Sequence, residues 1–267
     1  MNTTPEQPTP ARARLQQARE AEARRAVVRR RVITAAAVVA VLALAGATAA
    51  VVGAARTPAA EPVPAAAPTT LVVPANASGP DGTLITYGKA DAPHTLKVYE
   101  DFRCPICEKL ETSAGTTMQQ LADDGTYKIE YQLATFLDKN LGGKGSRTAL
   151  NAAGAALNEG VDKFKAFHDV LYANQPDERK DGFGDTNTIL DLADKVPGLK
   201  TDAFVKAVKE GTYLPWAAKV STAFDNSGVT GTPTVQLDGT KLNIFPGNQP
   251  ITGDAFKTLI QQSVGTP

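Results

Sequence analysis

Apolar residues recur with two different spacings between residues 96 and 133. The strand period of two appears at residues 127–133, where Tyr127, Ile129, Tyr131 and Leu133 alternate with polar residues. An apolar-rich run at residues 96–102 predicts a second, buried strand. Between them, residues 105–122 carry apolar side chains at helical intervals. A strand, a helix and a strand in this order predict a parallel pair joined by a crossover helix.

From residue 146 to about residue 227 the apolar spacing is helical throughout. We expect Ser146 to cap an alanine-rich helix and Trp216 to lie in the core. Strand patterns then return at residues 234–237 and 241–244, around an Asp-Gly turn, and a helix capped by Thr252 follows. The sequence therefore predicts an α/β domain over residues 81–264 with an all-helical insertion at about 146–227.

The region before residue 81 has a different composition. The whole chain balances 28 basic against 28 acidic residues, but residues 1–31 hold eight arginines and three glutamates. Residues 32–55 carry no charge, and as a helix they would span about 36 Å, more than the roughly 30 Å apolar core of a bilayer. We predict a basic cytoplasmic tail at 1–31 and a transmembrane signal-anchor helix at 32–55, which leaves the domain extracytoplasmic. An arginine-rich arm can also bind nucleic acid, but the apolar segment argues against that role.

A cleaved signal peptide is the alternative to an anchor. Ala47-Thr48-Ala49 has the form of a cleavage site, but the charged and apolar regions are both longer than in the usual signal peptide. Residues 56–80 contain six prolines among alanines, which favours an extended Pro/Ala-rich linker. In either case the domain would be exported to a compartment where disulfides persist.

The two cysteines of the chain, Cys104 and Cys107, stand at the start of the first predicted helix. A thiolate is the reactive form of cysteine, and a helix N-terminus stabilises it. With Pro105 at the first helical position, we expect Cys104 at the N-cap and expect Arg103 to add positive charge. This placement predicts a dithiol-disulfide redox centre.

Two other uses of the cysteines fit the sequence less well. A disulfide that closes so small a ring restricts the unfolded chain very little. A structural zinc site usually needs four ligands, and beyond the cysteines the chain offers only His94 and His168. We therefore predict neither a metal nor a cofactor.

Three segments resemble the DsbA-like thiol:disulfide oxidoreductases, in particular their membrane-anchored bacterial members. They are residues 100–107 (Glu-Asp-Phe-Arg-Cys-Pro-Ile-Cys), 164–175 (Phe-Lys-Ala-Phe-His-Asp-Val-Leu-Tyr-Ala-Asn-Gln) and 228–234 (Gly-Val-Thr-Gly-Thr-Pro-Thr). The resemblance implies a thioredoxin-like fold, with Cys104 as the exposed nucleophile and Cys107 as the more buried resolving thiol. It also implies a cis bond between Thr232 and Pro233, beside which an extended substrate would bind. The residues alone leave open that Pro233 simply begins a strand.

Glu100 and Asp101 precede the cysteine pair and are candidate proton relays for thiol exchange. Strand alternation puts them on opposite faces, so we expect at most one to point inward. The other interpretation is a pair of solvated carboxylates at a strand end. For His168 we expect a histidine packed at a helical surface.

These observations predict an extracytoplasmic, membrane-tethered oxidoreductase that forms disulfide bonds in exported proteins with free thiols. The resemblance implies a membrane quinone-linked partner that reoxidises it. Ile106 stands where the best-known family member has a histidine, and this argues against strong oxidising power, because isoleucine donates no hydrogen bond to a thiolate. A disulfide reductase or isomerase, and a non-catalytic peptide-binding module of the same fold, are the alternatives.

Overall fold

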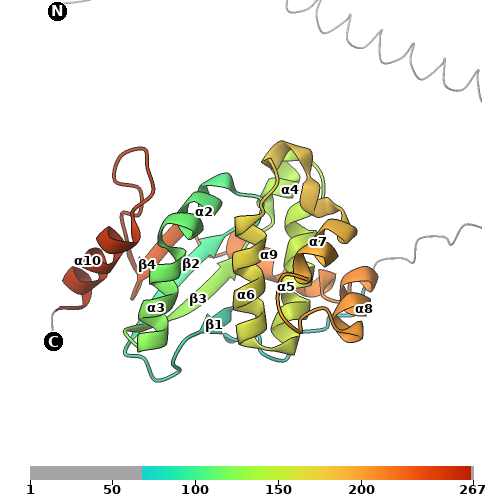
Figure 1. Cartoon of the computed structure of the whole chain (residues 1–267), viewed down its shortest axis with the longest axis horizontal. Coiled ribbons are helices and arrows are strands. Elements are labelled where there is room, and N and C mark those ends of the chain that lie inside the picture. Colours follow the sequence, from blue (N-terminus) through green and yellow to red (C-terminus); the bar gives the residue numbers. More distant parts are fainter. Residues whose placement is uncertain (1–67, 266–267) are drawn as a thin grey trace, which may run out of the picture. The chain divides into compact units, whose positions relative to one another are not determined.

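Five strands form one mixed sheet in the order β1-β3-β2-β4-β5 (Figure 1). The computed structural model describes residues 68–265. The strands are β1 (Ile85–Tyr87), β2 (His94–Glu100), β3 (Tyr127–Leu133), β4 (Thr234–Leu237) and β5 (Thr240–Lys241). Strands β2 and β3 are parallel, whereas β1 runs antiparallel to β3 and β4 antiparallel to β2. The predicted parallel pair is therefore confirmed.

One continuous helical segment crosses from β2 to β3. It consists of α2 (Pro105–Leu110), the π-helical η1 (Glu111–Gly115) and α3 (Thr116–Asp124). Gly125 ends it with a φ of 87°, a left-handed conformation that glycine adopts at helix ends, and its N–H donates to Ala122 O. The π turn adds a residue to the helical ladder in the middle of the segment, as π-bulges near functional sites often do.

The predicted helical insertion is present between β3 and β4. Its helices are α4 (Phe136–Leu141), α5 (Gly145–Glu159), α6 (Val161–Ala173), α7 (Thr186–Ala193), α8 (Asp202–Glu210) and α9 (Leu214–Asp225), with 3-10 turns η2 (Glu178–Lys180) and η3 (Gly182–Gly184). Helices α5, α7 and α8 lie at the end of the domain remote from α10 (Gly253–Val264), which packs on α3 (Figure 1). Trp216 is fully buried, as predicted, and a Cβ at Gly154 of α5 would meet its ring at 2.9 Å.

Alternate residues of the central strands face different helices. Gln132 of β3 donates from Nε2 to Val220 O of α9 at 3.1 Å, and its neighbour Tyr99 of β2 packs edge-on against Phe224 of the same helix. Tyr131, one residue away on β3, instead packs against His168 of α6. Because side chains alternate along a strand, this second face is also the one onto which Glu100 of β2 projects.

The structure differs from the sequence prediction at several element ends. Ser146 does not cap α5: the helix begins at Gly145, and the Asp138 carboxylate of α4 accepts the N–H groups of Ser146 and Arg147 at 2.9 and 3.0 Å. The second hairpin strand was predicted at residues 241–244 but is only Thr240–Lys241. Elements β1 and α4 were not predicted. The Thr252 cap of α10 is confirmed, because its Oγ1 accepts Ala255 N–H.

The predicted tail, the predicted anchor helix and residues 56–67 of the predicted linker lie outside the described residues. Within residues 68–265, no helix has both the length and the apolar character needed to cross a bilayer. The chain already contacts the domain before β1, where Asn76 donates to Leu157 O of α5 at 2.8 Å and Trp216 Nε1 donates to Gly82 O at 2.7 Å.

Candidate active site

Cys104 occupies the N-cap of α2, as predicted. Its backbone is extended, with φ −76° and ψ 112°, Pro105 follows at the first helical position, and Glu108 N–H donates to Cys104 O at 3.1 Å. Both cysteines are free thiols. Cys104 retains 6% of its surface exposed and Cys107 none, so the order of exposure expected from the resemblance is present.

The surroundings of Cys104 favour its thiolate. A hydrogen bond from the Cys107 thiol, together with contributions from Thr232 and the backbone N–H groups of Cys107 and Ile106, outweighs burial and lowers the pKa of Cys104 to about 7. The two N–H groups belong to the first turn of α2, as the helix-terminus argument requires. At neutral pH a substantial fraction of Cys104 is therefore thiolate.

The environment of Cys107 has the opposite effect. Burial, together with Cys104 and Glu100, raises the pKa of Cys107 well above its ordinary value. The pair thus consists of one accessible sulfur that ionises readily and one buried sulfur that holds its proton. This is the division of roles that thiol-disulfide exchange through a mixed disulfide uses.

The loop before β4 lies next to the cysteine pair. The Thr232–Pro233 peptide bond is cis, as the resemblance implied. The Cys104 thiol lies 3.5 Å from Thr232 O, and the buried Thr232 hydroxyl has no hydrogen-bond partner among the described residues. Residues 104 and 232 are therefore brought together from distant parts of the sequence.

Gln175, which follows α6, holds the start of α2 in place. Its Nε2 donates to Phe102 O at 2.8 Å and to Cys104 O at 3.1 Å. Gln175 and Pro105 also line a pocket of about 390 Å³ beside the cysteine pair, together with Glu108 and residues 176–179. Gln175 is the last residue of the segment 164–175 that resembles the DsbA-like enzymes, but the sequence predicted no role for it.

Arg103 does not supply positive charge to the Cys104 thiolate, contrary to the sequence prediction. Its guanidinium is buried and points away, toward Asp138 Oδ1 at 2.8 Å, Gly142 O at 2.9 Å and Glu178 O at 2.6 Å. An ion pair with Asp181 at 3.3 Å further neutralises it. Because carboxylates of the insertion satisfy this charge, Arg103 joins the redox loop to the insertion instead.

The prediction that at most one of Glu100 and Asp101 points inward is wrong, since both are fully buried. Asp101 lies beyond the last residue of β2, so strand alternation no longer applies to it. Its carboxylate accepts Ser146 Oγ–H at 2.6 Å, Arg103 N–H at 3.0 Å and Leu137 N–H at 3.2 Å. Burial raises the pKa of Asp101 to about 6 against these hydrogen bonds. These contacts give Asp101 a structural role, tying the redox loop to α4 and α5.

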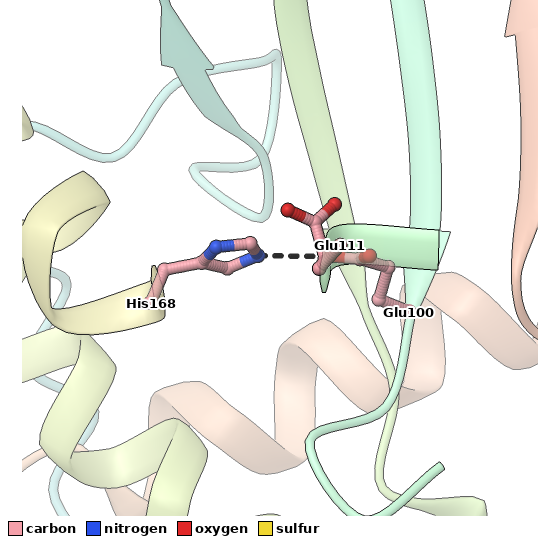
Figure 2. A group of neighbouring side chains, drawn as sticks. All are labelled: Glu100, Glu111 and His168. Atoms are coloured by element: carbon pink, nitrogen blue, oxygen red, sulfur yellow. Dashed lines mark hydrogen bonds and ion pairs between the residues drawn. The ribbon is translucent and has the colours of Figure 1, made fainter. Parts of the chain in front are cut away.

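Glu100 instead meets two residues that the sequence did not connect with it. His168 Nε2 lies 2.9 Å from Glu100 Oε2, and Glu111 completes a group whose ligand-type atoms all lie within 4.8 Å of one another (Figure 2). His168 is packed on its helix, as expected, but in the core, because its exposed fraction is zero and its ring lies against Tyr131. Of the described residues, these three form a set that could hold a metal ion. The sequence offered only a histidine next to Phe167 in a predicted helix.

Comparisons with known proteins agree with this geometry. The model of the family described as Thioredoxin matches residues 81–262. Disulfide bond formation protein D of Bacillus subtilis (strain 168) is 26% identical over 159 residues, which cover 59% of this chain and 69% of that protein.

Solved structures show the same likeness. The reduced DsbA of Mycobacterium tuberculosis is 26% identical with a TM-score of 0.55, and covers 67% of this chain and 88% of its own. The oxidised BdbD of Bacillus subtilis, at 24% identity and a TM-score of 0.57, shares the fold over 73% of this chain and 99% of its own. The chain therefore belongs to the thioredoxin family, and within it to the DsbA-like thiol:disulfide oxidoreductases.

Proposed function

We propose that this enzyme forms disulfide bonds in exported proteins, with Cys104 as nucleophile and Cys107 as resolving thiol. The observation that carries the proposal is the contrast between the two sulfurs: Cys104 has a pKa lowered to about 7, whereas burial raises that of Cys107. The likeness to proteins named for disulfide bond formation supports the oxidising direction.

The reaction begins from the Cys104–Cys107 disulfide. A substrate thiolate attacks Cys104 Sγ, a bond forms between the two sulfurs, and Cys107 leaves as a thiolate that takes up a proton. A second substrate thiolate then attacks the substrate sulfur of the mixed disulfide and releases the Cys104 thiolate. The substrate gains one disulfide and the enzyme is left as a dithiol, reduced by two electrons.

The cis-proline loop is the proposed substrate platform. Thr232 and Pro233 are partly exposed next to Cys104, and the Pro233 nitrogen carries no hydrogen to compete for partners. An extended peptide beside this loop could pair with the backbone of Thr232 while its thiol reaches Cys104. Ile106, 40% exposed, offers an apolar contact at the same place.

We further propose that residues 32–55 anchor the enzyme in the cell membrane, with the domain extracytoplasmic. The charge asymmetry around that segment supports this orientation. Return to the disulfide form requires an electron acceptor, and the proposed one is a membrane quinone-linked protein, on the basis of the family resemblance.

Alkylation of the reduced full-length chain tests the assignment of the two cysteines. We expect the rate of Cys104 modification by iodoacetamide to rise with pH and reach half its plateau near pH 7, because the thiolate fraction grows as pH passes the pKa. Cys107 should stay unmodified over the same time. Peptide mass spectrometry after quenching separates the two sites.

Cys107→Ala is the matched control for this titration. It removes the hydrogen bond that contributes most to the low pKa of Cys104, so the midpoint should move to higher pH. Equal and slow reaction of both cysteines in the unchanged protein, at the rate of an ordinary thiol, would contradict the proposed roles and favour a peptide-binding module.

Equilibration with glutathione tests the direction of electron flow. The pKa of Cys104, about 7, is higher than the roughly 3.5 of DsbA's cysteine, and Ile106 supplies no hydrogen bond to the thiolate. We therefore expect a potential between about −270 mV, the value of thioredoxin, and about −120 mV, the value of DsbA. A potential at or below that of thioredoxin would identify a reductase.

A further inference from the structure

Two backbone carbonyls next to the nucleophile accept hydrogen bonds from one side chain, Gln175. Its Nε2 lies 2.8 Å from Phe102 O and 3.1 Å from Cys104 O. Both partners are acceptors, so the amide must present its nitrogen, which carries two hydrogens, to this pair. One nitrogen therefore joins the loop before Cys104 to the start of α2.

The two carbonyls depend on this amide to different extents. Phe102 is buried, and among the residues described its carbonyl accepts no other hydrogen bond. A buried carbonyl without a donor is unfavourable. Cys104 O also accepts Glu108 N–H at 3.1 Å, so both of its lone pairs are used. Loss of the amide would thus leave the loop before Cys104 without its tie to the insertion at this point.

The same contact fixes the direction of the Cys104 sulfur relative to α2. The ψ torsion of Cys104 lies between its Cβ and its carbonyl, so Cys104 O turns with the helix, whereas Phe102 O belongs to the loop. That ψ is 112°, and it sets how the N–H groups of Ile106 and Cys107 face the sulfur. Because one nitrogen binds both carbonyls, the loop and the helix are held at a fixed relative orientation.

Gln175 is itself anchored at the end of α6. Its N–H donates to Tyr172 O at 3.2 Å, and Pro176, which follows, favours an extended backbone at Gln175. The Tyr172 ring packs on the Phe102 ring, with 5.4 Å between their centroids. The amide therefore reaches the redox loop from a fixed point, as a side chain that positions another group must.

The contact also changes the charge near the sulfur. A carbonyl oxygen carries partial negative charge, and Thr232 O already lies 3.5 Å from Cys104 Sγ. Cys104 O belongs to the same residue as the sulfur, and its two donors, Glu108 N–H and Gln175 Nε2, offset its negative charge. A thiolate at Cys104 therefore meets less repulsion than it would beside a carbonyl without donors.

We propose that Gln175 is a positioning residue for Cys104, whose amide holds the Phe102 and Cys104 carbonyls so that the sulfur faces the N–H groups of α2. The inference rests on the proposed exchange reaction. Gln175 binds backbone oxygens, so it acts through Cys104 and takes no part in the sulfur chemistry itself. A better stabilised Cys104 thiolate is released faster in the second step of substrate oxidation, and it favours the dithiol form at equilibrium.

Several ionisable groups face Cys104 and Gln175 from the surrounding elements. Asp177 and Arg179 pair with each other at 3.0 Å. The pKa values of Cys107 and Tyr172 are raised well above their ordinary range by burial, so both stay protonated near pH 7. All of these groups are unchanged in the variants proposed below, so differences between the pH profiles report on Gln175. The full set is Asp101 and Arg103 of the loop, Cys107 and Glu108 of α2, Tyr172 of α6, and Asp177, Glu178 and Arg179 beside the pocket.

Gln175→Met tests the proposal, because methionine fills a similar space but donates no hydrogen bond. In the alkylation of the reduced full-length chain by iodoacetamide, we expect the midpoint for Cys104 to rise by about half a pH unit or more. At about pH 8.5, where Cys104 is ionised in both proteins, the equilibrium with glutathione should shift toward the Cys104–Cys107 disulfide by about threefold, the ratio that half a pH unit represents.

Gln175→Glu separates hydrogen-bond donation from shape. The carboxylate has the size of the amide, but it presents only acceptors to two carbonyl oxygens and adds a negative charge. The alkylation midpoint should therefore rise further than in Gln175→Met. A midpoint equal to that of the unchanged protein would show that filling the space is sufficient, and the positioning role would be overturned.

Gln132→Met serves as the comparison for loss of stability. Gln132 is also buried and also donates from Nε2 to a backbone carbonyl, Val220 O at 3.1 Å, but it does so on the face of the sheet that α9 covers. We expect lower stability to urea, followed by Trp216 fluorescence, with an unchanged Cys104 midpoint and an unchanged glutathione equilibrium. Shifts as large as those of Gln175→Met would show that general destabilisation moves both quantities, and would overturn the proposal.

The outcomes distinguish this inference from the proposed function. If the unchanged protein oxidises a dithiol peptide and Gln175→Met keeps both its alkylation midpoint and its glutathione equilibrium, the positioning role is overturned while the proposed function stands. If Cys104 of the unchanged protein reacts no faster than an ordinary thiol and no peptide is oxidised, both fall.

Discussion

Replacing Cys104 with serine is expected to lower the rate of dithiol peptide oxidation by at least about a thousandfold, since loss of a nucleophile removes up to about a millionfold of the rate in other enzymes. A serine hydroxyl does not ionise near neutral pH, and it forms no disulfide with Cys107. The measurement is the oxidation of a dithiol peptide by the full-length chain in glutathione buffer. The buried Cys107 cannot substitute for Cys104, because it has no exposed surface and its pKa is raised.

Cys107→Ser is the matched variant, and its expected result is different in kind. Cys104 can still attack glutathione disulfide and release one free glutathione thiolate, but the chain has no Cys107 thiol to displace the glutathione that stays bound to Cys104. One mixed disulfide per chain should therefore accumulate, visible as a mass increase that reducing agent removes. If Cys104→Ser trapped glutathione and Cys107→Ser did not, the assignment of nucleophile and resolving thiol would be reversed.

Elements with strong local signals were predictable from the sequence. The alternation in β3, the helical spacing after Cys104 and the Asp238-Gly239 turn each occupy a few neighbouring residues, and the structure contains all three. Strand β1 has only three residues, and its partner residues in β3 lie 42 to 46 positions away, so no local pattern identified it. Ser146 had the form of a helix cap, but Asp138 from α4 supplies the capping carboxylate. The local preference of serine for a helix N-terminus can therefore be overridden when a carboxylate from another helix caps the same N–H groups.

The residues of the candidate site likewise fall into two groups: those that a local sequence pattern identifies and those that only the fold brings together. Cys104, Pro105 and Cys107 lie in one turn, so their chemistry could be inferred from adjacency. Glu100 and His168 are separated by 68 positions, and nothing in the sequence shows that β2 and α6 place them 2.9 Å apart. The orientation of Arg103 was also hidden, since its acceptors come from residues 138–181 of the insertion. The insertion therefore does more than enlarge the fold, because it supplies partners for the residues on either side of the redox motif.

Arg103 joins the redox loop to the insertion, and Arg103→Met is expected to lower the free energy of unfolding by about 3–5 kcal/mol. Methionine keeps much of the side-chain stem but leaves the buried Asp138 carboxylate without its closest charge partner. Two backbone carbonyls, Gly142 O and Glu178 O, also lose their donors. Urea unfolding of the full-length chain, followed by the fluorescence of Trp216, measures the loss.

Arg147→Met distinguishes a buried network from simple neutralisation of Asp138. The Arg147 side chain is 52% exposed and lies 3.9 Å from the same carboxylate, so its loss should change stability by no more than about 0.5 kcal/mol. Equal losses in the two variants would show that the carboxylate needs only a nearby positive charge. The pH midpoint of Cys104 alkylation should be unchanged in Arg103→Met, because the guanidinium points toward Asp138 and away from the sulfur. A midpoint moved to higher pH would restore the direct electrostatic role that the sequence suggested for Arg103.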